Sequence, residues 1–175
     1  MNNARTTVLF QQGWHKGVIG IVASRLIETY YRPTVILTES KDGFATGSAR
    51  SVPGYDLYQA IESCSDLLES FGGHMFAAGL TLKQENLPEF RERFEKFVSE
   101  TIRDEHLVPS VNIDCEIPLE DVTMELFRSL ERFQPFGPEN TAPVFASRRV
   151  KTLACQPVGS NGMHLKLTFA RQNCE

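Results

Sequence analysis

The chain has 175 residues, of which 41% are hydrophobic and 23% are charged, and its net charge is −4. These values are typical of one sizeable globular domain, or one domain with a small companion, and they exclude a generally basic nucleic-acid coat. The four cysteines form no CxxC pair and have no histidine at metal-ligand spacing, so we expect reduced thiols and a cytoplasmic protein. The sequence has neither a signal-peptide pattern nor a membrane-spanning apolar run, so no membrane partner is expected.

The first part of the chain alternates between strand-like and helix-like segments. Residues 6–11 predict a strand, residues 18–31 carry apolar side chains at helical spacing, and residues 34–38 predict a buried strand. The sequence Lys41-Asp42-Gly43 predicts a hairpin turn that leads into a further strand at 44–47. This order of elements is typical of a layered α/β domain.

The alternation continues over the next fifty residues. Asp56 is placed to cap a helix over 57–64, and residues 77–82 predict another strand. Asn86 is placed to cap a long amphipathic helix, whose apolar face runs from Leu87 to Val98. The helix is long enough to cover one face of the expected sheet.

The character of the sequence changes near residue 105. We expect the α/β domain, with a mixed sheet, to occupy residues 1–105, a linker residues 106–110, and a smaller, mostly β unit residues 111–175. Thr123 is placed to cap a short helix that runs through Phe133. Strands are expected at 111–117, 144–157 and 164–170. No closing element follows the last strand, so we expect an incomplete small barrel whose remaining strands lie outside the chain.

Two glycine-containing segments are candidate functional turns. One is Gly72-Gly73-His74, and the other is Thr46 to Ser51, which contains Gly47, Ser48 and Arg50. Backbone N–H groups, hydroxyls, a guanidinium and an imidazole are the donors that a phosphate prefers, and paired glycines let a backbone approach a ligand closely. Each segment alone has an ordinary explanation, since lone histidines are more often structural and an arginine can simply end a strand. Together they predict a phosphate-binding site.

A third candidate lies before the first helix, at Gly13 to Gly17. His15 and Lys16 would add positive charge to the N–H groups at the start of that helix, which can hold an anion. The alternative is a plain strand-to-helix turn in which Trp14 packs, and for this segment alone that alternative is favoured.

The C-terminal segment has a basic character, because residues 140–174 contain no Asp or Glu. Its candidate nucleic-acid contacts are Arg148, Arg149, Lys151 and Lys166, and the same stretch also carries Arg171. Since neutralising phosphates is the main source of affinity for nucleic acids, the segment predicts a DNA-facing surface on which Phe145 and Phe169 stack on bases. The alternative is a barrel core with a solvated basic face. Phe133 and Phe136 are expected to pack in a core or interface.

Several of these segments resemble the RecJ family, which consists of single-strand-specific 5′ to 3′ DNA exonucleases of the DHH phosphoesterase superfamily. Residues 13–26, 47–51 and 71–79 resemble its DHH-associated domain. Residues 113–114, 135–140 and 164–166 are similar to the start of its OB-fold domain. The motifs occur in the family's order and cover nearly the whole chain.

The resemblance implies phosphodiester hydrolysis shared between two domains. In the superfamily a separate N-terminal DHH domain holds Mn²⁺ or Mg²⁺ in a cluster of Asp and His residues, and the associated domain grips the nucleotide phosphates. That second role falls on Ser48, Arg50, Ser51 and His74, with Arg50 and His74 as the predicted catalytic residues. Further candidate phosphate ligands are Gly47, Gly72, Gly73, His15 and Lys16.

One departure from the family pattern is large: the sequence contains no Asp-His-His segment and no cluster of carboxylates and histidines. No metal ligand and no cofactor is therefore predicted in this chain, and Mn²⁺ or Mg²⁺ is expected in the DHH domain that it lacks. We expect a fragment that cannot cleave DNA alone and that serves DNA repair and recombination. Its expected partners are single-stranded DNA and the N-terminal DHH domain of the same protein.

Two alternatives stay open. The first is a DHH phosphodiesterase of short oligonucleotides or cyclic dinucleotides, but such proteins usually lack an OB domain, so the basic β segment after residue 110 argues against it. The second is a non-catalytic nucleic-acid-binding module that acts through the OB unit. An Asp-His-His segment upstream of this sequence would exclude the second alternative.

Overall fold

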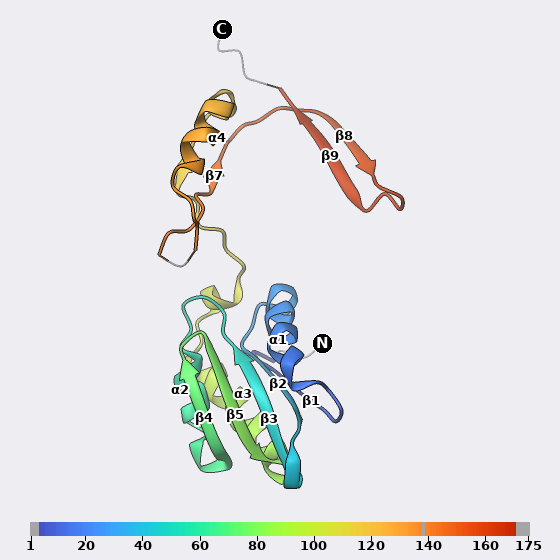
Figure 1. The fold of residues 1–175 in the computed structure, drawn as a ribbon, viewed down its shortest axis with the longest axis vertical. Helices are drawn as coiled ribbons and strands as arrows, with labels where there is room; N and C mark the ends of the chain where they lie inside the picture. The colour runs from blue at the N-terminus through green and yellow to red at the C-terminus, as the bar shows by residue number, and fades with distance from the viewer. Residues whose placement is uncertain (1–3, 138, 171–175) are drawn as a thin grey trace. The chain divides into compact units, whose positions relative to one another are not determined.

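The computed structural model describes residues 4–137 and 139–170, and its contacts divide the chain into two units, Met1–Pro109 and Ser110–Glu175 (Figure 1). The strands of the first unit are β1 (Thr7–Gln11), β2 (Thr34–Glu39), β3 (Phe44–Arg50), β4 (Leu68–His74) and β5 (Ala77–Lys83), and its helices are α1 (Lys16–Tyr30), α2 (Leu57–Glu62) and α3 (Leu87–Thr101). The sheet has the order β1-β2-β3-β5-β4, with β1 parallel to β2 and the other neighbours antiparallel. The predicted α/β class with a mixed sheet is confirmed.

Helices pack on both faces of this sheet, because the side chains of a strand alternate between its two faces. On one face, Ile19 and Ala23 of α1 pack on Ile36 of β2. On the other face, Val35 and Leu37 of the same strand join the core formed with α2 and α3. β2 is therefore buried on both sides, as its continuous apolar sequence predicts.

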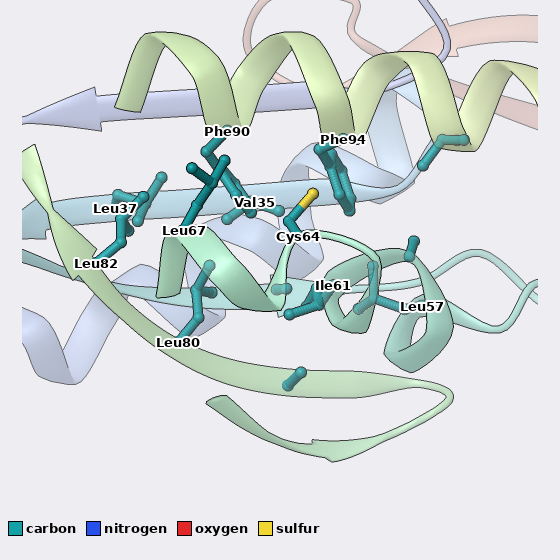
Figure 2. Close-up of a cluster of buried hydrophobic side chains, with 14 of the residues drawn as sticks. Val35, Leu37, Leu57, Ile61, Cys64, Leu67, Leu80, Leu82, Phe90 and Phe94 are labelled. Carbon is teal, nitrogen blue, oxygen red and sulfur yellow. The ribbon is translucent and has the colours of Figure 1, made fainter. Parts of the chain in front are cut away.

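Two stacked phenylalanine rings lie at the centre of the larger core (Figure 2). Phe90 and Phe94 are one turn apart on α3, both are fully buried, and their ring centroids are 5.6 Å apart. Leu57 and Ile61 of α2 and Leu82 of β5 belong to the same cluster. Burying a side chain of this size contributes roughly 1.5–3 kcal/mol, so this cluster is the main support of the first unit.

The two glycine segments predicted as turns are strands, and that prediction is wrong. β3 continues through its glycine to Arg50, and β4 contains the glycine pair and ends at His74. The turn between β4 and β5 is formed by Met75 and Phe76. The physical reason is pairing: β3 lies between β2 and β5 and bonds to both, and this pairing outweighs the low β propensity of glycine.

The two predicted caps in this unit have different outcomes. The Asp56 carboxylate accepts hydrogen bonds from the N–H groups of Tyr58 at 3.0 Å and Gln59 at 3.3 Å, which confirms it as the cap of α2. Asn86 precedes α3 but its side chain does not cap the helix. Its Nδ2 instead donates to the carbonyl of Leu67 at 3.0 Å, because the amide is turned toward the short helix Ser65–Leu67 that precedes β4.

A carboxylate on α3 holds the segment that leads into β1. Glu95 Oε1 accepts the backbone N–H of Arg5 at 2.7 Å, and Oε2 accepts that of Thr6 at 2.9 Å. The hydroxyl of Thr6 also donates to Oε2. The Arg5 guanidinium pairs with Asp104 at 2.7 Å. These bonds tie the outer strand of the sheet to the helix that covers it.

The second unit consists of short elements. They are β6 (Cys115–Glu116), α4 (Met124–Glu131), β7 (Phe145–Ala146), β8 (Thr152–Val158) and β9 (His164–Phe169). β6 is parallel to β7, and β8 and β9 form an antiparallel hairpin. Thr123 caps α4 as predicted, by accepting the N–H of Leu126 at 3.2 Å. The smaller, mostly β unit is thus confirmed as a class.

Details of this second unit differ from the sequence prediction. The strand expected at 111–117 is reduced to β6, and the one expected at 144–157 is divided into β7 and β8. Phe133 was expected to pack but is 64% exposed. Within residues 110–137 and 139–170, no side chain is buried, so the alternating apolar pattern has no described surface to pack on.

Membrane insertion has no support in the described helices, since none of them is both long and apolar enough to cross a bilayer.

Candidate phosphate-binding site

The strand register brings Arg50 and His74 to one row of the sheet. Arg50 of β3 pairs with Ala77 of β5, and His74 of β4 pairs with the same Ala77. Directly paired residues project to the same face, and neighbouring strands are about 4.8 Å apart, so the two backbones are separated by about 10 Å. The predicted guanidinium and imidazole therefore flank a single alanine on the α1 face.

The Arg50 guanidinium is half-buried and already partly fixed. Its Nη1 donates to Ser48 Oγ at 2.8 Å and to the carbonyl of Ala49 at 2.8 Å. Ser48 lies two residues earlier on β3 and therefore on the same face. Within the described residues neither Nη2 nor Nε has a hydrogen-bond partner, so both can donate to an anion.

His74 is exposed and uses one ring nitrogen to close its hairpin. Its Nδ1 accepts the backbone N–H of Phe76 at 3.2 Å, and the rings of the two residues meet edge to face at 5.9 Å. A neutral imidazole that accepts at Nδ1 carries its proton on Nε2. The Nε2–H group is then the donor that His74 can offer to a ligand.

Ser51 connects the end of β3 to the same hairpin. Its N–H donates to the carbonyl of Phe76 at 3.0 Å, while the N–H of Leu57 donates to that of Met75 at 3.1 Å. The Ser51 hydroxyl donates to the carbonyl of Tyr55 at 2.7 Å. To donate to a phosphate as predicted, this hydroxyl would have to give up its hydrogen bond to the Tyr55 carbonyl.

The three glycines of the predicted site fall into two kinds. Gly47 is buried, and a Cβ there would lie 2.8 Å from Leu37 Cδ2, so this glycine is required by packing. Gly73 has a φ of +150°, and a Cβ would lie 2.3 Å from the carbonyl oxygen of Ala77, so it is required by the hairpin. Gly72 is exposed, and a Cβ there would meet no atom within 4 Å. The fold itself therefore needs glycine at two of these positions but not at Gly72.

Gly72 of β4 and Gly79 of β5 form the floor of a shallow groove on the same face. These residues face each other across β4 and β5, one row from Arg50 and His74. The groove is also lined by the hydroxyl residues Thr46, Ser70 and Thr81. A strand glycine with open space above it often marks a place where a ligand or another backbone comes close. Sequence reasoning did not identify Gly79, Ala77 or these hydroxyls, although small and polar residues alternate along β3 and β5.

His15 and Lys16 make hydrogen bonds outside this row. His15 Nδ1 accepts the N–H of Gly17 at 3.1 Å and so caps α1 itself, and Lys16 Nζ donates to Ser40 Oγ at 2.8 Å. Among the described residues, neither side chain bonds to Arg50 or His74. The phosphate-binding role of His15 and Lys16 therefore stays a prediction.

The donor set of this row fits an anion rather than a divalent cation. Guanidinium, imidazole N–H and hydroxyl groups suit phosphate, whereas Mg²⁺ and Mn²⁺ prefer carboxylate oxygens. In the part of the chain that the structure describes, no three His, Cys, Asp or Glu side chains lie close enough to hold a metal.

Two of the predicted basic contacts in the second unit line a hollow of mixed charge. Arg148 and Arg149 share it with Glu116 and Glu120. The Nε of Arg148 pairs with Glu116 Oε2 at 2.8 Å, and both side chains are exposed. An acidic partner in the same hollow reduces the positive potential that a phosphate would meet.

The other two predicted basic contacts are spread along the hairpin. Lys151 lies next to the start of β8, where its carbonyl accepts the N–H of Ala170. Lys166 of β9 pairs with Gln156, which follows Lys151 by five residues. Lys166 and Phe169 are three residues apart on β9 and so project to opposite faces, which separates the predicted stacking ring from the cation. Phe145 is half-buried, and Arg171 lies outside the described residues.

Comparison with known families agrees with the geometry of the first unit. The family model of the DHHA1 domain matches residues 3–100, more than half of the chain, and that of the RecJ OB domain matches residues 113–175. The chain belongs to the DHHA1 domain family, with a RecJ OB segment after it, and the resemblance seen in the motifs is confirmed.

Individual relatives align with nearly the whole of this chain. The single-stranded-DNA-specific exonuclease RecJ of Bacillus subtilis is 35% identical over 169 residues, which are 96% of this chain and 22% of that protein. The protein of the same name from Haemophilus influenzae is 31% identical over 163 residues, or 91% of this chain and 28% of that protein. A crystal structure of RecJ with Mn²⁺ from Thermus thermophilus superimposes with a TM-score of 0.80 at 28% identity, over 98% of this chain and 26% of that one. The chain thus spans about a quarter of the length of these relatives.

Proposed function

We propose that this chain is the substrate-binding portion of a RecJ-type exonuclease that hydrolyses single-stranded DNA from 5′ to 3′. The proposal is supported by relatives of that name, which are 31–35% identical over more than nine-tenths of the chain. The observation that carries it is the row in which Arg50 and His74 both pair with Ala77.

In this proposal the row receives one backbone phosphate of the DNA close to the bond that is cleaved. Nη2 of Arg50 and Nε2–H of His74 approach it from the two sides of Ala77, whose small side chain leaves room for it. Both donors become more favourable as negative charge builds up on the phosphate oxygens in the transition state. The chain's contribution is then to position the phosphate and to neutralise its charge.

The divalent ions are assigned to the DHH domain of the whole protein. Mn²⁺ or Mg²⁺ supplies an activated water when it is bound there. The residues of this chain do not fit such an ion, so we assign them no step that involves it.

The OB unit is assigned to the single strand beyond the cleavage site. Arg148, Arg149, Lys151 and Lys166 provide charge for phosphates along the strand. A DNA-processing enzyme of this kind acts in repair and recombination, and we place it in the cytoplasm.

The test uses the full-length protein with Arg50→Ala and His74→Ala. Each variant is expected to degrade single-stranded DNA in Mn²⁺ about 100-fold more slowly, because a lost donor to a developing charge costs about that much. Arg25→Ala is the matched control, since Arg25 is an exposed arginine on α1 that pairs only with Glu28. Wild-type rates in both site variants would sink the assignment.

The same assay separates the two alternatives. A full-length protein that binds single-stranded DNA but leaves it intact in Mn²⁺ fits the non-catalytic module. Hydrolysis of dinucleotides or cyclic dinucleotides, with long strands left intact, fits the small-substrate phosphodiesterase. Either result contradicts the proposal.

A further inference from the structure

Helix α1 passes very close to the Arg50 side chain at one position, Gly20. A Cβ placed on Gly20 would lie 2.9 Å from Arg50 Nη2, 3.1 Å from Ser48 Oγ and 3.7 Å from Arg50 Cζ. The guanidinium and the serine hydroxyl therefore occupy the space that any other residue would fill with its side chain.

Backbone conformation does not explain this glycine. Gly20 lies inside α1, between Ile19 and Ile21, with helical backbone that every residue adopts. Glycine in a helix interior is less favourable than alanine. The residue thus weakens its own helix, and the atoms that benefit from the missing side chain belong to Arg50 and Ser48.

The close approach confines a side chain that would otherwise be mobile. Nη1 of Arg50 is held by Ser48 Oγ and by the carbonyl of Ala49, and Nη2 lies against the α1 backbone at Gly20. A free arginine loses rotamer entropy when it is fixed. Holding the guanidinium in place before the ligand arrives removes part of that cost from binding.

We propose that Gly20 is a positioning residue for Arg50, and that its lack of a side chain sets where the guanidinium meets the phosphate. This rests on the proposed role of Arg50. A methyl group at this position pushes Nη2 away from α1 and disturbs the bond to Ser48. Because the displaced atoms are the end of a flexible side chain, the fold is left intact.

The central test compares stability with binding for Gly20→Ala in the full-length protein. The melting temperature is expected to equal or exceed that of the wild type, because alanine favours the helix. The affinity for a short fluorescent oligothymidylate without divalent metal, and kcat/KM for single-stranded DNA in Mn²⁺, are each expected to fall about tenfold, as for one weakened charge-assisted hydrogen bond. Thr29→Ala, at an exposed position in the last turn of α1, is the matched control and should change neither the affinity nor kcat/KM.

The double variant Gly20→Ala/Arg50→Ala tests whether the effect passes through the guanidinium. If it does, Gly20→Ala causes no further loss once Arg50 is alanine, within about twofold. A full tenfold loss in that background, wild-type binding in Gly20→Ala, or a melting temperature more than about 5 °C below wild type would each overturn the inference. Normal binding in Arg50→Ala itself contradicts the proposed function instead, so the two failures are distinguishable.

Discussion

The two units of the chain differ in how far they bury their large apolar side chains. In the first unit Phe90 and Phe94 are fully buried between a helix and the sheet, whereas in the second unit Phe133 and Leu165 are 64% and 65% exposed. A two-stranded hairpin such as β8–β9 is marginally stable without a surface to pack on. The comparison teaches that only the first unit, as described, contains the rigid packing that can hold two side chains at a fixed spacing.

The largest expected difference between the two units comes from truncating one phenylalanine in each of them. Phe94→Ala is expected to lower the free energy of unfolding by about 3–5 kcal/mol, because it leaves a cavity in a dense core. Phe133→Ala, with its ring exposed, should change it by less than about 0.5 kcal/mol. Urea denaturation of the 175-residue chain, followed by far-ultraviolet circular dichroism, measures both units. Equal effects would show that the contrast in burial has no energetic meaning.

A smaller loss is expected from Glu95→Ala. The variant leaves the N–H groups of Arg5 and Thr6 without their acceptor, which costs about 1–3 kcal/mol. Glu28→Ala removes only an exposed pair with Arg25 and should leave the free energy of unfolding nearly unchanged. Both are measured by the same urea titration, and a Glu95 variant as stable as the Glu28 variant would contradict the clamp.

High pH provides a third test, confined to the first unit. Burial is the main cause that raises the pKa of the Cys64 thiol and of the Tyr55 phenol. In the unfolded chain these groups ionise at their usual pKa values of about 8.5 and 10, while in the folded chain they stay neutral to higher pH. The stability that their neutral forms contribute is therefore complete below about pH 8 and is lost as pH rises through the folded pKa values. For each group, the free energy of unfolding falls by at most about 1.4 kcal/mol per pH unit.

Two measurements check this alkaline effect. Urea titrations at increasing pH should show declining stability, and Cys64→Ala should flatten the part that begins near the thiol's ordinary pKa. With Cys174 replaced by serine, a thiol reagent should label exposed Cys115 and Cys155 rapidly and Cys64 slowly. Rapid labelling of all three in the native chain would argue against the buried, neutral thiol.

The smallest expected effect concerns the second unit and tests whether it contacts DNA. Lys166→Ala should leave stability unchanged within about 0.5 kcal/mol, because the side chain is exposed. It should lower the slope of log affinity for single-stranded DNA against log salt by about 0.7, the amount expected for one phosphate contact. Fluorescence anisotropy at several salt concentrations measures the slope, with Lys96→Ala, on the exposed side of α3, as the control. An unchanged slope would remove Lys166 from the DNA surface.

Local patterns in the sequence predicted the parts of the fold that depend on neighbours along the chain. The buried strand β2, the spacing of α1 and the caps at Asp56 and Thr123 are of this kind. The two glycine segments were predicted as turns because glycine usually marks them, and only pairing with distant strands makes them β3 and β4. The exposed Phe133 has the same cause, since a residue's burial depends on what packs against it.

The candidate site shows the same limit. Arg50 and His74 could be chosen from their chemistry, but their shared partner Ala77 follows only from the strand register. His15 and Lys16 carry equally suitable groups, but their side chains bond to Gly17 and Ser40. The contact of Gly20 with Arg50 joins a helix to a strand thirty residues later, so no spacing in the sequence reveals it.

The register through Ala77 also decides how this region can change during evolution. Arg50 and His74 are separated by 23 residues of chain, yet their spacing is set by two strand pairings and not by that chain. An insertion beside the exposed residues Ser65 and Asp66 of the short helix Ser65–Leu67 would lengthen the connection at a small entropic cost, because loop closure depends only weakly on length. Relatives can therefore differ in length between the two motifs and still keep the guanidinium and the imidazole on either side of one alanine.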